Sequence, residues 1–352
     1  MALVLVSVSA EAATRWVNPL KQDYYTVQNQ AWENEIGKSF VRLPDRAEQS
    51  VRKPLWDLSR NSAGLSLNFV TDAPSVTVRY TVDGQHSMPH MSATGVTGVD
   101  MYRVNADGKE DYCFGSYSFG DTITYRYSGL PAGSGEYHLN LPLYNTVKWL
   151  EVGVPDTCSF RFLERNDAKP VVVYGTSIAQ GACSSRPGMS WVNIVRRELG
   201  MPVVNLGFSG NGRLEPEMIS LISEIDASLY LLDCMPNLTP KSEDEVYNLV
   251  LDAVHSLRAK HSTPILLVEH AGYSNAPTNA GQLALYERLN AGQRRAFEQL
   301  QSEGVPNLYY ITHDEINMPA DGWVDYVHPT DLGAQRQADV VAPRIRAILN
   351  MR

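Results

Sequence analysis

The sequence predicts two parts of different fold class: an antiparallel β-sandwich over residues 14–165, then a three-layer α/β/α domain with a parallel sheet over residues 166–352. Short segments in which apolar and polar residues alternate predict the sandwich, because one face of each strand is buried. Short, wholly apolar strands separated by helical segments predict the parallel sheet, which helices cover on both faces. A hydrophobic content of 43% in 352 residues is enough to give each part its own core.

Strand-like alternation runs through the first part, with turn signals between the strands. The clearest strands are predicted at residues 76–80, 123–127 and 137–141, and the turns at 83–84, 107–108 and 131–135. No long amphipathic helix is expected there. This spacing of strands and turns is typical of an antiparallel sandwich.

After residues 166–170 the pattern changes to strands that alternate with helices. The strands are predicted near 171–174, 202–206, 229–233, 264–268 and 308–311, and the helices near 189–199, 215–225, 243–260, 282–303 and 331–349. In such sheets, ligands bind beyond the carboxyl ends of the strands. We therefore expect the functional residues in the loops that follow these strands.

The net charge and the apolar segments indicate which partners and which location to expect. The formal net charge of −9 argues against nucleic acid, which needs a basic surface to displace counterions. Residues 1–13 hold a short apolar segment ending in small residues, which predicts an export signal and a secreted or periplasmic protein, although an apolar N-terminal strand is the alternative. Nowhere else does an apolar run approach the ~20 residues of a membrane helix, so no membrane span is expected.

Two of the four cysteines, Cys183 and Cys234, each follow a strand at the expected functional edge. They are therefore candidates for close neighbours. A disulfide between them and a pair of free buried thiols are both open.

Ser177 follows the first strand of the α/β part, in the loop Gly175-Thr176-Ser177. A serine hydroxyl needs a positioned base to become a nucleophile, and glycine lets the chain turn so that a backbone amide can face a carbonyl oxygen. Taken alone, the loop is better explained as a strand-to-helix turn with a capping serine. It lacks the Gly-Lys-Ser/Thr ending of a phosphate-binding loop.

The next two strand-end loops offer hydrogen-bond donors. Gly210 has no side chain to block the approach of its amide to a ligand oxygen. Asn237 offers a side-chain amide to a developing oxyanion. Each residue on its own is an ordinary loop or turn residue.

Asp325 and His328 lie three residues apart, just before the last predicted helix. A tight loop can bring the carboxylate against the imidazole and fix its tautomer, while the other ring nitrogen faces Ser177. His313 and Asp314 form a rival pair, but they are adjacent in sequence and an exposed loop position is expected for them.

These four segments, in this order, resemble the SGNH family of GDSL-type esterases and acylhydrolases over residues of about 170 to 350. The resemblance implies a flavodoxin-like α/β domain, a nucleophile at Ser177, a base at His328 oriented by Asp325, and an oxyanion hole made by the Ser177 amide, Gly210 and Asn237. Gly-Thr-Ser replaces the more usual Gly-Asp-Ser, and Asn237 stands in Met-Pro-Asn rather than Gly-x-Asn-Asp, yet the four functional residue types are kept.

Residues 98–102, Gly-Val-Asp-Met-Tyr, resemble the Gly-x-Asp-Leu-Tyr motif of a jelly-roll-like β-sandwich that precedes some bacterial esterases of this family. The resemblance suggests an O-acetylated carbohydrate as the substrate. Two alternatives stay open: a short-chain lipase or acylhydrolase acting on other esters, and a carbohydrate-binding protein whose hydrolase part is idle. No metal or organic cofactor is expected for the esterase.

Four further residues are candidates for substrate binding. His90 lies in a loop of the first part that can lean over the catalytic edge, and His270 ends the strand near 264–268. Trp191 and Tyr326 are aromatic residues that can stack on a sugar ring, although aromatic residues beside strands are more often core. His86 and His90 are spaced like a metal-binding pair, but the sequence shows no third ligand, so no metal site is predicted.

Overall fold

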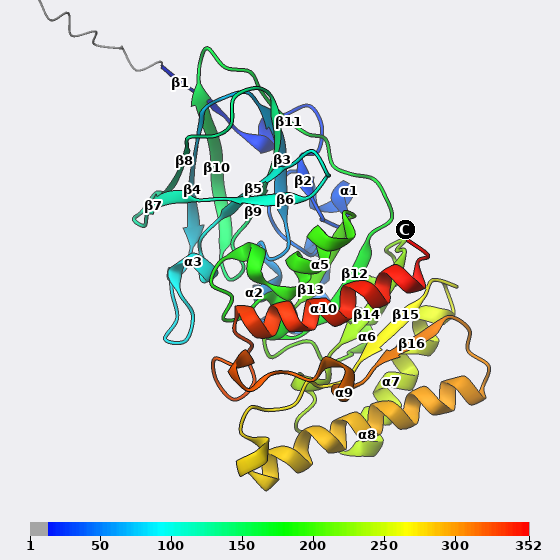
Figure 1. The fold of residues 1–352 in the computed structure, drawn as a ribbon. Helices are drawn as coiled ribbons and strands as arrows, with labels where there is room; N and C mark the ends of the chain where they lie inside the picture. The colour runs from blue at the N-terminus through cyan, green and yellow to red at the C-terminus, as the bar shows by residue number, and fades with distance from the viewer. Residues whose placement is uncertain (1–12, 352) are drawn as a thin grey trace, which may run out of the picture.

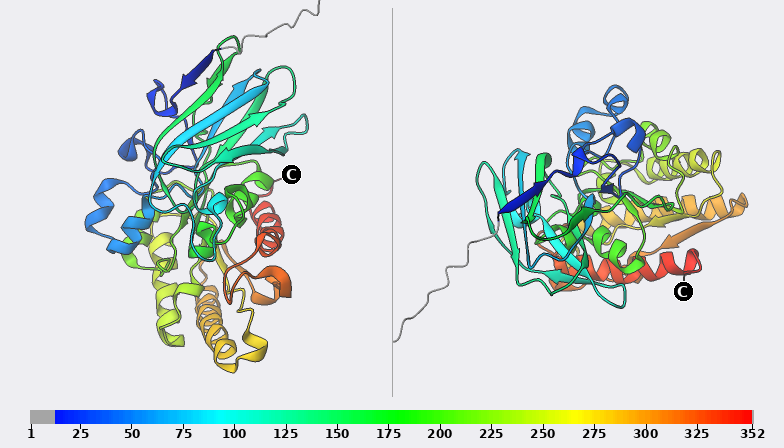
Figure 2. Two further views of the ribbon diagram at one scale, coloured as in Figure 1. Left: turned by 90° about the vertical axis from the view of Figure 1, so that its left-hand side faces the viewer. Right: turned by 90° about the horizontal axis from the view of Figure 1, so that it is seen from above.

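The computed structural model describes residues 13–351 of the chain (Figure 1). The predicted export segment, residues 1–13, therefore lies outside the described residues except for its last position. A β-sandwich stacks on one end of an α/β domain (Figures 1 and 2). The predicted order of the two fold classes is confirmed.

Two antiparallel sheets form the sandwich. Their strands are β1 (Thr14–Val17), β2 (Val27–Gln28), β3 (Ser66–Thr71), β4 (Ser75–Asp83), β5 (Asp100–Val104), β6 (Glu110–Cys113), β7 (Gly115–Ser118), β8 (Ile123–Ser128), β9 (Gly135–Asn140), β10 (Thr146–Pro155) and β11 (Phe160–Phe162). One sheet has the order β1-β10-β4-β8-β7, and the other β11-β3-β9-β5-β6 with β2 beside β3. In β4 the side chains of Val76, Val78 and Tyr80 are buried and alternate with less buried ones, as the sequence pattern predicts.

A five-stranded parallel sheet forms the centre of the α/β domain. Its strands are β12 (Val171–Gly175), β13 (Val203–Gly207), β14 (Leu229–Asp233), β15 (Ile265–Val268) and β16 (Leu308–Ile311). The strand order is β13-β12-β14-β15-β16, which is the flavodoxin-like arrangement. Because β13 and β14 both pair with β12, the loops after these three strands meet at one edge.

Helices cover both faces of this sheet (Figure 1). One face carries α5 (Trp191–Leu199) and α10 (Asp331–Ile348), which pack on Val171, Val173 and Leu231. The other carries α6 (Pro216–Ile222), α7 (Glu243–Arg258) and α8 (Ala280–Ser302). The predicted three layers are therefore confirmed.

Several shorter helices complete the described chain. They are α1 (Glu33–Ile36), α2 (Lys53–Ser59), α3 (Ala93–Val96), α4 (Ser177–Gln180) and α9 (His313–Ile316), with 3-10 turns at Pro19–Lys21, Asp45–Gln49, Pro187–Met189, Met235–Asn237 (η4), Ala276–Thr278 and Ala320–Gly322. None of the helices in residues 13–351 combines the length and apolar character that crossing a membrane requires.

The segment that contains α2 belongs to the core of the α/β domain although it precedes most of the sandwich in sequence. Leu43, Val51 and Leu55 are buried in one cluster with Tyr174 and Phe208. This segment of the first part therefore packs into the α/β core, whereas the sandwich strands bury a separate apolar cluster. The boundary between residues 165 and 166 stays a prediction.

Candidate active site

Ser177 lies at the carboxyl edge of the parallel sheet, just after β12, the second strand in the sheet order. β12 ends at Gly175, and Thr176 caps α4 by accepting a hydrogen bond from the Ile178 amide at 3.3 Å. A Cβ atom on Gly175 would lie 2.7 Å from the Cβ of Ala179, so only glycine fits where the chain turns from strand to helix. Ser177 thus begins the helix, where its N–H has no carbonyl partner within the helix.

Ser177, His328 and Asp325 form one hydrogen-bonded chain. The Ser177 Oγ lies 2.9 Å from His328 Nε2, and His328 Nδ1 lies 2.7 Å from Asp325 Oδ2. Because the carboxylate can only accept, it fixes the tautomer with hydrogen on Nδ1. Nε2 is then the acceptor for the Ser177 hydroxyl.

The loop backbone fixes the position of the Asp325 carboxylate. Its Oδ1 accepts hydrogen bonds from the amides of Val327 and His328 at 2.8 and 2.7 Å. Burial alone would raise the pKa of Asp325, but the hydrogen bonds from the His328 ring and from these two amides outweigh it and lower the pKa below its ordinary value. The carboxylate is therefore ionised at neutral pH.

Gly210 and Asn237 line the same cavity as Ser177. Gly210 has the left-handed backbone angle φ of 70°, with open space where a Cβ would stand. Asn237 ends η4, directly after β14, and its Oδ1 accepts the amide hydrogen of Gly212 at 3.1 Å. The Nδ2 group of Asn237 therefore remains as the hydrogen-bond donor of this side chain.

These residues surround one cavity of about 360 Å³. Its lining comprises Ser177, Ser209, Gly210, Arg213, Pro236, Asn237, Thr239, Pro240, Tyr273, Tyr326, Val327 and His328. The rings of Tyr273 and Tyr326 lie 5.6 Å apart and form an aromatic wall. Among residues 13–351, the lining contains one guanidinium, that of Arg213, and no carboxylate.

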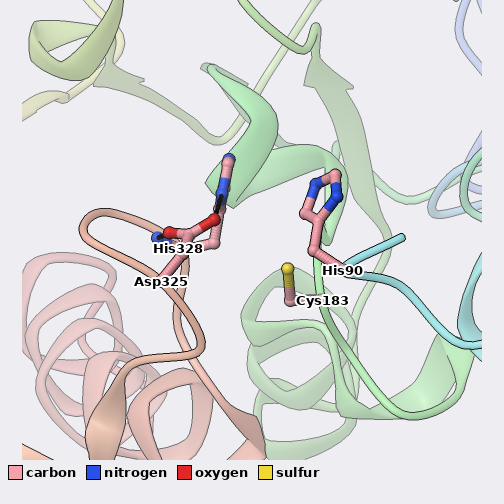
Figure 3. Close-up of side chains that lie close together, drawn as sticks. All are labelled: His90, Cys183, Asp325 and His328. Carbon is pink, nitrogen blue, oxygen red and sulfur yellow. Dashed lines mark hydrogen bonds and ion pairs between the residues drawn. The ribbon is translucent and has the colours of Figure 1, made fainter. Parts of the chain in front are cut away.

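The first part of the chain supplies contacts at this edge. The His90 ring, in the loop after β4, lies 5.8 Å from the His328 ring, so the expected approach of this loop to the edge is observed (Figure 3). Tyr144 donates a hydrogen bond to the Ser177 carbonyl at 3.3 Å, and Gln180 donates to the Leu143 carbonyl at 3.1 Å. The first part of the chain thus contacts both α4 and His328.

Two of the four candidate substrate residues lie elsewhere. Trp191 is 1% exposed because the apolar face of α5 packs on the sheet, so it belongs to the core. His270 is fully buried behind Tyr273, at a ring distance of 4.4 Å, and its Nδ1 accepts the Gly272 amide hydrogen. Burial lowers the pKa of His270 to about 3, so the ring is neutral. Neither residue lines the cavity, whereas Tyr326 does.

The four cysteines, which all lie within the described residues, are free thiols. Cys234 is buried, and its Sγ lies 3.6 Å from the Tyr174 carbonyl. Cys183 instead lies beside His90 and His328 (Figure 3). Burial, aided by the negative charge of Asp325, raises the pKa of Cys183 to about 12. A disulfide between Cys183 and Cys234 is therefore not formed in this structure.

Sequence reasoning missed Tyr273 and Tyr144 as neighbours of the site, whereas it predicts Cys183 at this edge. The position of Tyr273 in the loop after β15, at the carboxyl edge, was an available signal. Tyr144 reaches the site through packing between distant segments, for which the local sequence gives no signal.

A flavodoxin-like sheet with hydrogen-bonded serine, histidine and aspartate residues at its carboxyl edge is the arrangement of a serine hydrolase. Residues 168–346 match the model of the GDSL-like lipase/acylhydrolase family, and residues 14–160 match that of the N-terminus of SGNH-hydrolase-type esterases. The chain belongs to the GDSL-like lipase/acylhydrolase family and carries the N-terminal Gly-x-Asp-Leu-Tyr domain of its SGNH esterases.

Solved structures resemble the chain over nearly its whole length. A protein described as a GDSL-like lipase from Bacteroides ovatus is 31% identical, with a TM-score of 0.88 over 97% of this chain and 99% of that one. The salicylyl-acyltransferase of a tetracycline biosynthetic pathway is 19% identical, with a TM-score of 0.74 over 96% and 98%. A family two carbohydrate esterase from Cellvibrio japonicus is 13% identical, with a TM-score of 0.60 over 96% and 99%. No curated protein matches the sequence.

Proposed function

We propose that the protein is a serine esterase that removes O-acetyl groups from carbohydrate. The observation that carries the proposal is the hydrogen-bonded chain from Asp325 through His328 to Ser177, which opens into a cavity also lined by Gly210 and Asn237. Ser177, His328, Gly210 and Asn237 line this one cavity, which supports their assignment as nucleophile, base and hydrogen-bond donors.

In the first half of the reaction, His328 Nε2 takes the proton of the Ser177 hydroxyl as Oγ attacks the ester carbonyl. The carbonyl oxygen gains negative charge, which the amides of Ser177 and Gly210 and the Nδ2 group of Asn237 stabilise. Asp325 stabilises the imidazolium through Nδ1. The protonated His328 then gives its proton to the alcohol oxygen as the carbon–oxygen bond breaks, and the acyl group stays on Ser177.

In the second half, water replaces the alcohol. His328 takes a proton from this water, the resulting hydroxide attacks the acyl carbon, and Ser177 leaves with the proton from His328. The products are a carboxylic acid and the starting enzyme. These steps use residues of the chain and water.

The shape and lining of the cavity support a small acyl group on a sugar. A volume of about 360 Å³ suits a small acyl group with part of its alcohol, and the wall of Tyr273 and Tyr326 offers aromatic faces for a sugar ring. The carbohydrate esterase from Cellvibrio japonicus shares the fold, at 13% identity. The apolar start of the sequence also supports a secreted or periplasmic enzyme, where polysaccharide substrates occur.

A serine-directed phosphonate tests the mechanism. We expect one label per chain, located on Ser177 by peptide mass spectrometry, with loss of ester hydrolysis in proportion to labelling. An enzyme that hydrolyses esters without a label on Ser177 contradicts the mechanism. A chain that neither reacts nor hydrolyses esters, but binds glycans, supports the idle carbohydrate-binding alternative.

Matched aryl esters test which acyl group the enzyme removes. Acetate should be released from the aryl acetate with a higher kcat/KM than octanoate from the aryl octanoate, and acetate should also be released from an acetylated polysaccharide. A preference for octanoate contradicts the deacetylase proposal and favours the lipase.

For the location, N-terminal mass spectrometry of exported and cytoplasmic fractions should find a shortened chain in the exported fraction.

A further inference from the structure

Four metal-binding side chains from three separate segments meet beside the nucleophile. They are His90 in the loop after β4, Cys183 after α4, and Asp325 and His328 in the loop before α10. One ligand atom of each lies within 4.8 Å of those of the other three. Figure 3 shows the thiol of Cys183 between the His90 ring on one side and the Asp325–His328 pair on the other.

The kinds of atom in this cluster select one class of cation. Imidazole nitrogen, thiolate sulfur and a carboxylate oxygen together suit Zn²⁺, whereas Mg²⁺ and Ca²⁺ prefer oxygen ligands. Zinc ligands lie about 2.0–2.3 Å from the ion, which places them roughly 3.3–3.8 Å from each other in a tetrahedral site. The longest separation between ligand atoms needs to shorten by about 1 Å to reach this geometry.

Two of the four side chains have no other partner. Within residues 13–351, neither the His90 ring nor the Cys183 thiol makes a hydrogen bond, although Cys183 is about half buried. The His90 side chain is exposed, and it lies in a turn that the bridge between Met88 and Met91 closes, so the ring can move toward the other ligands. Cys183 has the left-handed angle φ of 64°, which is uncommon for a residue with a side chain.

We propose that His90, Cys183, Asp325 and His328 bind one Zn²⁺ ion and that this ion reversibly inhibits the enzyme. Binding displaces the proton of the Cys183 thiol and uses the neutral His328 ring and the Asp325 carboxylate as ligands. While the ion is bound, His328 is no longer available as a base for Ser177. The inhibition rests on the proposed esterase function, whereas the binding does not.

The binding is tested without reference to catalysis. Zn²⁺ alone is titrated by calorimetry into the chelator-treated full chain carrying Ser177→Ala. We expect one ion per chain, and binding weakened roughly tenfold or more by Cys183→Ser or His90→Ala, since each removes a ligand. Co²⁺ should give a thiolate charge-transfer absorption band that Cys183→Ser removes.

Matched variants separate this site from adventitious binding. His86→Ala removes another histidine of the same loop, one that packs on Phe119, and Cys113→Ser removes another partly exposed thiol. Both should bind Zn²⁺ like the parent chain. Binding that survives Cys183→Ser, or a Co²⁺ complex without the thiolate band, overturns the proposed site.

The inhibition is tested on the chain with Ser177 intact. Zn²⁺ should abolish ester hydrolysis, EDTA should restore it, and Cys183→Ser should raise the Zn²⁺ concentration for half-inhibition roughly tenfold or more relative to its own uninhibited rate. Full ester hydrolysis with the site occupied overturns the inhibition. A chain that binds Zn²⁺ as described but hydrolyses no ester supports the site and contradicts the proposed function instead.

Discussion

Asn237 and Gly212 are joined by a hydrogen bond of 3.1 Å in which the side-chain Oδ1 of Asn237 accepts the backbone amide hydrogen of Gly212. Gly212 itself packs against β12, because a Cβ on it would lie 2.0 Å from the Gly175 carbonyl oxygen. The end of β12 and the loops after β13 and β14 are therefore held in contact. The same bond leaves Nδ2 of Asn237 as the donor beside Ser177.

Asn237→Asp separates these two roles of the side chain. Aspartate keeps an acceptor for Gly212 but loses the donor, so we expect kcat to fall by about 10²–10³ or more with a smaller change in KM. Asn237→Ala, which loses both, should fall by a similar factor. Steady-state kinetics on an aryl acetate measures this, and near-parental activity of Asn237→Asp would show that Asn237 only holds the loop.

Ser177→Ala should remove nearly all activity because it deletes the nucleophile. We expect a loss of about 10⁴-fold or more in kcat, with the thermal unfolding midpoint little changed. Ser184→Ala, in a buried serine of the same segment, is the matched control and should keep activity. Residual hydrolysis by Ser177→Ala close to the parental rate would rule out the acyl-enzyme.

Asp325→Asn should change the tautomer of the His328 imidazole while the ring stays in the site. An amide NH₂ facing Nδ1 favours the wrong tautomer of His328, so kcat should fall by about 10⁴. Asp321→Asn changes another carboxylate of the same segment, and this variant should leave kcat nearly unchanged. Equal effects of the two substitutions would argue against orientation of His328 by Asp325.

Trp191 should matter for stability and not for substrate binding. Because its side chain is 1% exposed in the core, Trp191→Ala should lower the free energy of unfolding by about 3–5 kcal/mol. Trp191→Phe should keep KM for an acetylated glycan close to that of the parent chain. Urea unfolding and kinetics measure the two effects, and a raised KM in a stably folded Trp191→Phe would restore the sugar-stacking role.

Asp233 gives a pH-dependent stability. Burial raises its pKa from 3.8 to about 7, so between these values the folded state holds a proton that the unfolded state has lost. Stability therefore falls as pH rises through this window, by up to about 1.4 kcal/mol per pH unit. Asn cannot ionise and can still accept the hydrogen bond from Gln337.

The Asp233→Asn variant should therefore lose this part of the pH dependence and gain stability over the parent chain near pH 8. Unfolding by urea at pH 5 and pH 8 measures the difference. Parallel pH profiles for the two chains would mean that Asp233 is ionised in the folded state.

The parallel sheet and its strand-end loops could be predicted from sequence because they depend on local patterns. An apolar strand such as β12 is buried on both faces, and parallel strands direct their carboxyl ends to one edge. The candidate site residues each follow a strand or precede the last helix; they are Ser177, Gly210, Asn237 and the pair Asp325 and His328. The topology of the sheet therefore brings them together at its carboxyl edge.

Only the tertiary structure decided which of the other candidate side chains reach this edge and which do not. His270 and Trp191 have strand-end and helix-start positions like those of the functional residues, yet both are turned into the core. His90 and Cys183 come within 4.8 Å of each other because the sandwich packs against the α/β domain. Spacing along the chain fixes the residues that share one sheet edge, whereas contacts between separate segments depend on the packing of whole domains, which no local pattern encodes.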